Sequence, residues 1–120
     1  MIVVLGFYNR KPGMTYESFS DYWKNVHGPM ISGNAEVRKY MKRYIQHHLR
    51  PNEASHVKAL GYDGFSESWY ETEEDRAKLL ALPVFQNDIV PDEDVFLDMS
   101  TKRTSMFDTQ VVQIGRPGTE

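Results

Sequence analysis

The sequence predicts an α+β protein in which strands and helices follow the order β-α-β-β-α-β. Three observations support this prediction. The run from Ile2 to Tyr8 is rich in β-branched and aromatic residues, as strands are. Between Tyr16 and Met30 the apolar residues recur every three or four positions, as on one face of a helix. From residue 40 onward, two apolar runs, a second helix signal and a last apolar run complete the order.

The first half of the chain is predicted to form a strand and a long helix. Polar residues, a proline and a glycine at 9–13 end the strand. Thr15 is a candidate N-cap for the helix that follows. The predicted apolar stripe consists of Tyr16, Phe19, Trp23, Val26 and Met30. Gly28 and Pro29 are expected to interrupt this helix, which should end within residues 28–33.

The second half is predicted to hold three strands and a second helix. The strands are expected at residues 40–49, 65–70 and 103–114, with a loop at 52–63. Thr72, followed by acidic residues, is typical of a helix N-terminus, and Pro83 should end that helix. In residues 84–98, Pro91 divides the apolar residues into short helical pieces.

This order is the split βαβ arrangement of a ferredoxin-like fold, with an antiparallel four-stranded sheet and helices on one face. We expect a single domain over residues 1–114 and a flexible tail over residues 115–120. The first strand has apolar side chains at both alternating positions, which a sheet buried on one face does not need. The second face is therefore expected to be buried by another subunit.

The composition argues against several classes of function. The 120 residues include 14 basic and 17 acidic side chains, and the formal charge of −3 gives no electrostatic attraction to nucleic acid or to an anionic membrane. Cysteine is absent, which removes disulfides, thiolate metal sites and thiol nucleophiles. No apolar run approaches the roughly 20 residues of a membrane span, and no basic leader precedes the first strand. We therefore expect a cytoplasmic protein.

Four segments in this order resemble the EthD family. They are Phe19…Tyr22-Trp23…His27-Gly28-Pro29, YIQHHLRP at 44–51, DGFSESWY at 63–70 and DEDVFLD at 92–98. The resemblance runs from Ile2 to about Ile114. Gly28 stands where such proteins often have alanine, and His47 where they often have asparagine, and neither departure changes the expected fold.

The resemblance implies a member of the dimeric α+β barrel superfamily. Such a protein is a homodimer whose two sheets close into a barrel, and each subunit holds a pocket between its helices and its sheet. Similar proteins have an accessory role in fuel-ether degradation, isomerise methylated lactones, or dehydrate or decarboxylate aromatic polyketide intermediates. The fold therefore implies the pocket and leaves the reaction open.

His27 is the principal candidate for chemistry. It lies four residues after Trp23 and three before Met30, at the border of the apolar stripe. Partial burial there would lower its pKa and keep a neutral imidazole that takes a proton from a carbon acid or a phenol. The alternative is that His27 caps carbonyl groups at a helix end.

The second predicted strand supplies further candidates. Tyr44, Gln46 and His48 alternate along it and so share one face, where they can orient an oxygen-bearing substrate. We expect Tyr44 and His48 to act with His27, the alternative being a core tyrosine and a solvent-exposed histidine. His47 points the other way and is expected to be structural. No His-x-His or His-x-x-x-His pair exists, so no metal site is predicted.

Aromatic side chains are expected to form the walls of the pocket. The predicted substrate-binding residues are Trp23, Gln46, Phe65, Trp69 and Tyr22. Glu67 shares a strand face with Phe65 and Trp69, and is expected either to pair with an arginine such as Arg43 or to be an acid of raised pKa. The acidic run 92–94 is interpreted as a solvated helix start or a feature of the dimer edge.

These residues favour a cofactor-free lyase or isomerase that uses acid and base chemistry on a small hydrophobic, aromatic or polyketide-like substrate. His27 would move the proton, while Tyr44 or His48 polarises a carbonyl or phenolate oxygen. Three alternatives remain open. The protein binds a hydrophobic metabolite as an accessory without catalysis, it is a purely structural dimer with a filled pocket, or it binds haem through His27 or His48, as some barrel relatives do.

Overall fold

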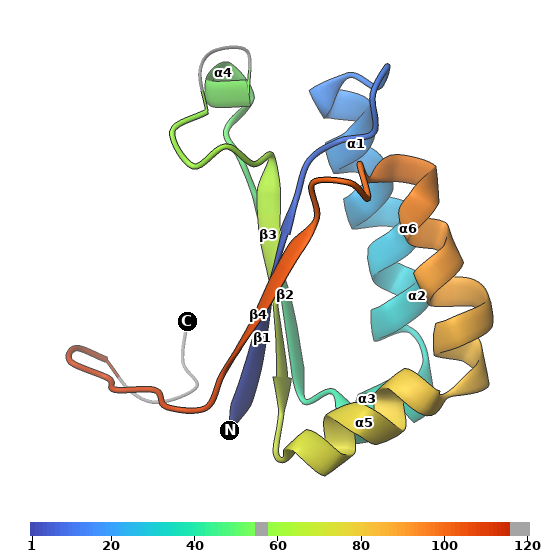
Figure 1. Ribbon diagram of the computed structural model, residues 1–120, viewed down its shortest axis with the longest axis vertical. Helices are drawn as coiled ribbons and strands as arrows, with labels where there is room; N and C mark the ends of the chain where they lie inside the picture. Colours follow the sequence, from blue (N-terminus) through green and yellow to red (C-terminus); the bar gives the residue numbers. More distant parts are fainter. Residues whose placement is uncertain (55–57, 116–120) are drawn as a thin grey trace.

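An antiparallel sheet of four strands forms one layer of the computed structural model, which describes residues 1–54 and 58–115 (Figure 1). The strands are β1 (Ile2–Tyr8), β2 (Arg43–His48), β3 (Gly64–Tyr70) and β4 (Arg103–Phe107). Their spatial order is β2-β3-β1-β4, and each neighbouring pair is antiparallel. This is the order of the split βαβ arrangement, so the predicted ferredoxin-like α+β fold is confirmed.

Two long helical segments form the second layer and pack on one face of the sheet (Figure 1). The first consists of α1 (Tyr16–Tyr22), the π-helix η1 (Trp23–His27) and α2 (Gly28–Ser32); the second consists of the π-helix η2 (Phe85–Ile89) and α6 (Val90–Phe96). The helix α5 (Glu73–Ala81) is separate from the second segment, because it ends before Leu82, whose backbone is extended, next to the predicted stop at Pro83. The hydroxyl groups of Thr15 and Thr72 accept hydrogen bonds from the backbone N–H groups of Ser18 and Asp75. Both predicted N-caps are therefore confirmed.

The prediction that Gly28 and Pro29 interrupt the first helix is wrong, because a π turn carries the helix through them. The N–H of Gly28 donates to the carbonyl of Trp23, five residues back, and the helix continues to Ser32. A proline in an α-helix lacks an N–H and its ring clashes with the carbonyl four residues back, and the wider π turn displaces that carbonyl. The same arrangement precedes Pro91, where Val90 donates to the carbonyl of Phe85.

The π turn also changes which side chains face the core. Trp23, His27 and Ile31 are buried at a spacing of four residues, whereas Val26 is 43% exposed. The predicted stripe is therefore wrong at Val26, whereas Met30 packs against the core as predicted. This shift places His27 within the buried stripe of the helix, where its sequence position indicated the border.

Three boundaries also differ from the prediction. Residues 40–42 do not belong to β2, because Tyr40 ends α3 (Ala35–Tyr40), which Asn34 caps by accepting from the N–H groups of Glu36 and Val37. The single-turn helix α4 (Pro51–Ala54) lies at the start of the loop expected at 52–63, and residues 55–57 of that loop lie outside the described residues. β4 ends at Phe107 and does not extend to residue 114. Residues 116–120 of the predicted tail lie outside the described residues.

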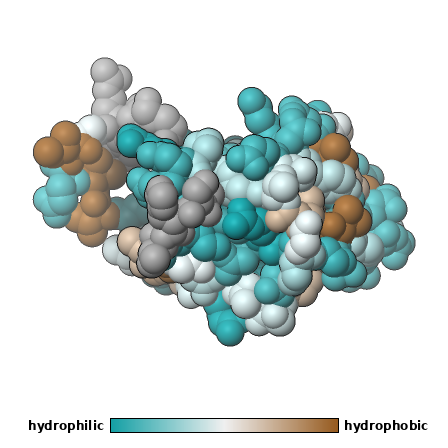
Figure 2. Space-filling view, turned by 90° about the horizontal axis from the view of Figure 1, so that it is seen from above, coloured by the Kyte–Doolittle hydropathy of each residue, from teal (hydrophilic) through white to brown (hydrophobic). Residues whose placement is uncertain are grey.

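The segment that follows β4 leaves the body of the molecule. It carries the exposed apolar residues Val111, Val112 and Ile114. In Figure 2 hydrophobic surface gathers on a projecting end of the molecule, the side on which this segment lies in Figure 1. Within a single chain these side chains remain in contact with solvent.

The core lies between the sheet and the helices and divides into two clusters. One is built from Val4, Ile31, Val37, Met41, Tyr70, Leu79 and Ile89. The other is built from Tyr16, Phe19, Trp23, Phe96 and Leu97. A cavity borders both clusters, since residues of each line it.

The opposite face of the sheet also carries large apolar side chains. Val3, Leu5 and Phe7 of β1 point to this face, and Phe7 stacks on Phe65 of β3 with ring centroids 5.4 Å apart. In Figure 1 the two long helical segments lie on the other side of the sheet. In the described part of the chain, no helix has the length and apolar character needed to cross a bilayer.

Candidate functional site

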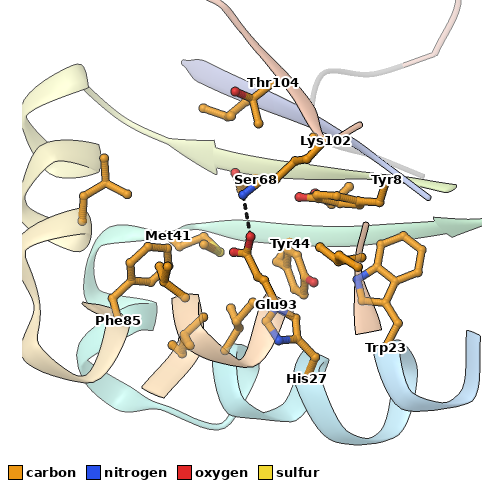
Figure 3. A pocket seen from close by; sticks show the side chains of 18 of the residues that line it. Tyr8, Trp23, His27, Met41, Tyr44, Ser68, Phe85, Glu93, Lys102 and Thr104 are labelled. Atoms are coloured by element: carbon orange, nitrogen blue, oxygen red, sulfur yellow. Dashed lines mark hydrogen bonds and ion pairs between the residues drawn. The ribbon is translucent and has the colours of Figure 1, made fainter. Parts of the chain in front are cut away.

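A cavity of about 220 Å³ lies between the sheet and the helical layer (Figure 3). The sheet contributes Val4, Gly6, Tyr8, Tyr44, Ser66 and Ser68 to its lining. The helices contribute Trp23, His27, Ile31, Ile89, Glu93 and Phe96, and Met41, Arg76, Phe85 and Lys102 complete much of the wall. Its volume is below the roughly 300–1,000 Å³ of sites for drug-sized ligands, so it fits a molecule of one or two rings.

His27 reaches the cavity from the π turn and is held by a carboxylate behind it. Its Nδ1 lies 2.9 Å from Oδ2 of Asp92 on α6, and the His27 side chain is 5% exposed. Because a carboxylate only accepts, Nδ1 carries a proton and donates it. In the neutral form of the ring the lone pair therefore lies on Nε2, and the ring packs against Phe96 with centroids 4.9 Å apart.

Tyr22 completes this group from the other side of Asp92. Its hydroxyl donates to Oδ1 of Asp92 at 2.6 Å, and this hydrogen bond raises the pKa of Tyr22 to about 12. Tyr22 therefore holds the carboxylate that orients His27, whereas the sequence analysis expected it in the pocket wall. Asp92 is 13% exposed, so its interpretation as part of a solvated helix start is wrong.

Tyr44, Gln46 and His48 share one face of β2, as predicted, and form a chain of hydrogen bonds. Ser20 Oγ lies 2.7 Å from His48 Nδ1, and His48 Nε2 lies 2.8 Å from Gln46 Oε1. The Gln46 amide nitrogen donates to the carbonyl of Trp23 at 2.9 Å and to the Tyr44 hydroxyl at 3.1 Å. Since Tyr44 accepts from Gln46, its own O–H proton is available to a ligand in the cavity.

His48 lies behind the cavity wall. Both of its ring nitrogens have protein partners, and its ring packs against Trp23 with centroids 4.4 Å apart and the two planes tilted by 33°. The direct action on substrate that the sequence analysis expected of His48 does not fit this position. Through its hydrogen bond, His48 orients Gln46, and Gln46 in turn orients the hydroxyl of Tyr44.

The environment of His48 predicts a pH dependence of stability. Burial lowers the pKa of His48, and the charges of Lys24 and His47 lower it further. As the pH falls through the ordinary value near 6.5, the unfolded chain therefore binds more protons than the folded one. The resulting stabilisation is complete above that value and is lost as the pH falls toward the pKa of the folded state.

Between about pH 7.5 and about pH 5.5 we expect the free energy of unfolding to fall further in the wild type than in His48→Asn. Chemical denaturation at the two pH values measures this difference. Equal losses in the two proteins would show that His48 does not cause this dependence.

Tyr8 supplies a second phenol to the cavity. Its hydroxyl lies 2.9 Å from Ser66 Oγ, and the ring passes over Gly6, where a Cβ atom would lie 2.2 Å from the phenol oxygen. Burial raises the pKa values of both Tyr8 and Tyr44, so both phenols stay protonated at neutral pH and are hydrogen-bond donors. No feature of the sequence indicates this role, because Tyr8 ends an apolar strand.

An ion pair joins the two layers at the cavity. Glu93 of α6 and Lys102, just before β4, approach to 2.5 Å between Oε1 and Nζ (Figure 3). The side chains are 12% and 26% exposed. From the sequence, Glu93 was expected to lie in the solvated acidic run, and no sequence feature pointed to Lys102. Phe96 lies four residues after Asp92, on the same face of the helix. This spacing was the one sequence feature that indicated that this part of α6 faces the core.

Phe65 and Trp69 do not face the cavity. They alternate with the cavity residues Ser66 and Ser68 and point to the opposite face of the sheet, so placing them in the pocket with Trp23 was wrong. Glu67 lies between them and accepts from His47 Nε2 at 2.5 Å and from Trp69 Nε1 at 3.2 Å. Glu67 thus has a histidine as its hydrogen-bond partner where an arginine such as Arg43 was expected, and Arg43 lies over the Trp69 ring.

The arrangement of polar groups bears on metal and haem binding. In residues 1–54 and 58–115, no group of three or more histidine and acidic side chains is placed to hold a metal ion. A haem macrocycle would exceed the cavity, and both nitrogens of His48 are bonded to protein. The haem alternative therefore does not fit these residues.

Comparison with known proteins connects this site to a family. The EthD domain matches residues 11–100. The chain is 28% identical over 112 residues to the dehydratase ustZ of Ustilaginoidea virens, covering 87% of this chain and 77% of that protein. It is 29% identical over 126 aligned positions to the decarboxylase claH of Passalora fulva, covering 98% and 79%.

Solved structures show the same fold at lower identity. An EthD family protein from Bacillus halodurans superimposes with a TM-score of 0.66 at 12% identity, covering 92% of this chain and 99% of that one. A protein from Arabidopsis thaliana gives 0.64 at 18% identity, covering 95% and 100%. HapK from Hahella chejuensis gives 0.65 at 10% identity, covering 98% and 100%. Since the EthD domain matches most of the chain, the protein belongs to the EthD family.

Proposed function

We propose that this protein is an acid–base lyase of the dehydratase or decarboxylase type, acting on a small hydrophobic, aromatic or enolisable molecule bound in the cavity. The observation that carries the proposal is the buried pair of His27 and Asp92, 2.9 Å apart, with His27 at the cavity wall. A carboxylate behind an imidazole fixes its tautomer and stabilises the imidazolium that forms when Nε2 takes a proton.

The reaction follows from the protonation states of the site. In a dehydration, Nε2 of His27 takes a proton from the carbon next to a carbonyl group, and Asp92 stabilises the imidazolium. The C–H electron pair forms the new double bond as hydroxide leaves the neighbouring carbon, and the imidazolium proton completes the water molecule. The O–H of Tyr44 donates to the carbonyl oxygen as it gains negative charge.

A decarboxylation would use the same groups in the opposite order. Protonated His27 would deliver its proton to the ring carbon that carries the carboxylate, and the C–C electron pair would return to the ring as CO₂ leaves. Two relatives of about equal identity, a dehydratase and a decarboxylase, support both forms of the proposal. An isomerase would differ only in returning the proton to another carbon. All three reactions use His27 as the base or the acid, and they need no further group from outside the chain.

The experiment for this proposal is a substrate screen with wild type and a His27 variant in parallel. Aromatic β-hydroxy ketones report dehydration by new ultraviolet absorption, and hydroxylated aromatic acids report decarboxylation by CO₂ release. Turnover in the wild type that is lost in the variant supports the proposal. Equal turnover in both would contradict it and leave a binding protein as the better account.

We also propose that the protein is a cytoplasmic homodimer. In this dimer, the face of each sheet that the helices leave uncovered packs against the other subunit. Phe107 of β4, which pairs with Val3 and is 48% exposed, and the exposed apolar residues Val111, Val112 and Ile114 that follow it support this dimer, because monomers rarely expose contiguous apolar surface. Light scattering should therefore give twice the 14.0 kDa mass of one chain. Leu5→Glu should produce the monomer, and Val95→Glu, at an exposed position of α6, should leave the dimer intact. A wild-type mass of one chain would contradict the proposal.

A further inference from the structure

The Glu93–Lys102 pair is the group of charges in the cavity that the acid–base mechanism does not use. Its two members come from opposite layers, α6 and the end of the segment before β4. Figure 3 shows Lys102 reaching from the sheet side to the carboxylate of Glu93, close to Tyr44 and His27. The pair therefore lies where a ligand held by His27 would have to fit.

The ammonium group of Lys102 has donors to spare. In the described part of the chain its hydrogen-bond partner is Glu93 Oε1, at 2.5 Å, whereas an ammonium group has three N–H donors. Its side chain is 26% exposed, so it remains accessible from the cavity. A ligand oxygen can therefore bind Lys102 either beside Glu93 or in its place.

The cations that line the cavity favour an anionic ligand. Among the described residues of the lining, Arg76 and Lys102 are cations and Glu93 is a carboxylate. Asp92 does not line the cavity, and its two carboxylate oxygens are bonded to Tyr22 and His27. A ligand carboxylate that takes the place of Glu93 at Lys102 therefore keeps Lys102 paired, as a neutral ligand would not.

We propose that Lys102 determines specificity by binding a carboxylate of the substrate, and that Glu93 occupies this position in the free protein. The inference rests on the proposed function and names the substrate class: a hydroxylated aromatic or enolisable carboxylic acid. The apolar part lies against Trp23, Phe85 and Phe96, and its carboxylate displaces that of Glu93.

The contact between Lys102 and the substrate carboxylate also indicates that this carboxylate is not the group lost in the reaction. Decarboxylation removes the negative charge of the carboxylate that is lost, so an ammonium ion bound to that carboxylate stabilises the ground state more than the transition state. The carboxylate bound by Lys102 is therefore a handle that remains in the product. The reaction takes place at another carbon, within reach of His27.

The test compares the binding of para-hydroxybenzoate with that of its neutral amide, para-hydroxybenzamide, by titration calorimetry on the full chain. Wild type should bind the acid about tenfold more tightly, as a hydrogen-bonded charge pair allows. Lys102→Met should bring the ratio close to one. Glu93→Gln should tighten binding of the acid and leave that of the amide unchanged, because it removes a competing carboxylate.

The control is Lys11→Met, which removes another lysine that contacts α6, through Asp94, outside the cavity lining. It should keep the wild-type ratio, and thermal melting checks that each variant is folded. The proposal is overturned if wild type binds neither compound or does not prefer the acid. It is also overturned if Lys102→Met keeps the preference or if Arg76→Met removes it. Failure of Glu93→Gln to tighten binding of the acid would overturn it as well.

Failure of this inference differs from failure of the proposed function. Binding needs no turnover, so His27→Gln should keep the preference for para-hydroxybenzoate over para-hydroxybenzamide, which depends on Lys102. Binding that depends on Lys102, without turnover of any compound in the screen, would contradict the lyase proposal alone. Turnover that depends on His27, without any preference for acids, would contradict the role of Lys102 alone.

Discussion

Replacing His27 with glutamine is expected to lower kcat by about 10²–10⁴-fold for any compound that the wild type converts, the usual contribution of a positioned acid or base. Glutamine keeps a polar side chain of similar length in the buried site, which limits the loss of stability. The measurement is steady-state turnover with KM determined separately. A fall in kcat at nearly constant KM indicates a role in the chemical step.

Asp92→Asn provides the second half of this prediction. An asparagine can present its amide N–H to Nδ1 of His27, which places the imidazole proton on Nε2, where the lone pair is needed. We therefore expect a large fall in kcat with little change in stability. Asp94→Asn is the matched control, since Asp94 lies two residues later with its side chain 75% exposed. Wild-type turnover in Asp92→Asn would contradict the assigned tautomer.

Replacing Asp63 with alanine is expected to lower the free energy of unfolding by about 3 kcal/mol, as the breaking of buried ion pairs does. The Asp63 side chain is fully buried between two cations. Its Oδ2 accepts from the backbone N–H of Arg10 at 2.9 Å, and its Oδ1 from Lys58 Nζ at 3.1 Å. Its own backbone bonds to Tyr8 and Leu49, so it joins the ends of three strands.

The control for Asp63 is Asp94→Ala, which breaks an ion pair of 3.8 Å with Lys11 at the surface. Exposed pairs contribute less than about 1 kcal/mol, so this variant should unfold almost as the wild type does. Urea denaturation of the two variants gives the comparison. Similar losses in both would show that Asp63 does not have the structural role assigned to it.

The sequence was sufficient for the fold because its signals were local. The β-branched run of β1, the threonine caps at Thr15 and Thr72 and the alternation in β3 each indicated an element that the structure contains. The face of each side chain in a strand also followed from alternation, as Tyr44 and Gln46 show. Strand order followed from the order of elements.

The candidate site was predicted less completely, because its contacts join distant segments. His27 was identified from the helix pattern, but its partner Asp92 lies 65 residues later, in an acidic run typical of a solvated helix start. The π turn moved His27 into the buried stripe, and no propensity indicates such a turn. Phe65 and Trp69 were misplaced because strand alternation alone does not tell which face the helices cover.

The most direct test of the central claim follows proton transfer itself. An enolisable aromatic β-hydroxy ketone that the wild type binds is incubated in D₂O, and NMR measures exchange of the acidic C–H for deuterium. Exchange well above the buffer rate in the wild type, and its loss in His27→Gln that still binds the compound, is the predicted result. Exchange at the same rate with both proteins would contradict the assignment of His27 as the residue that moves the proton.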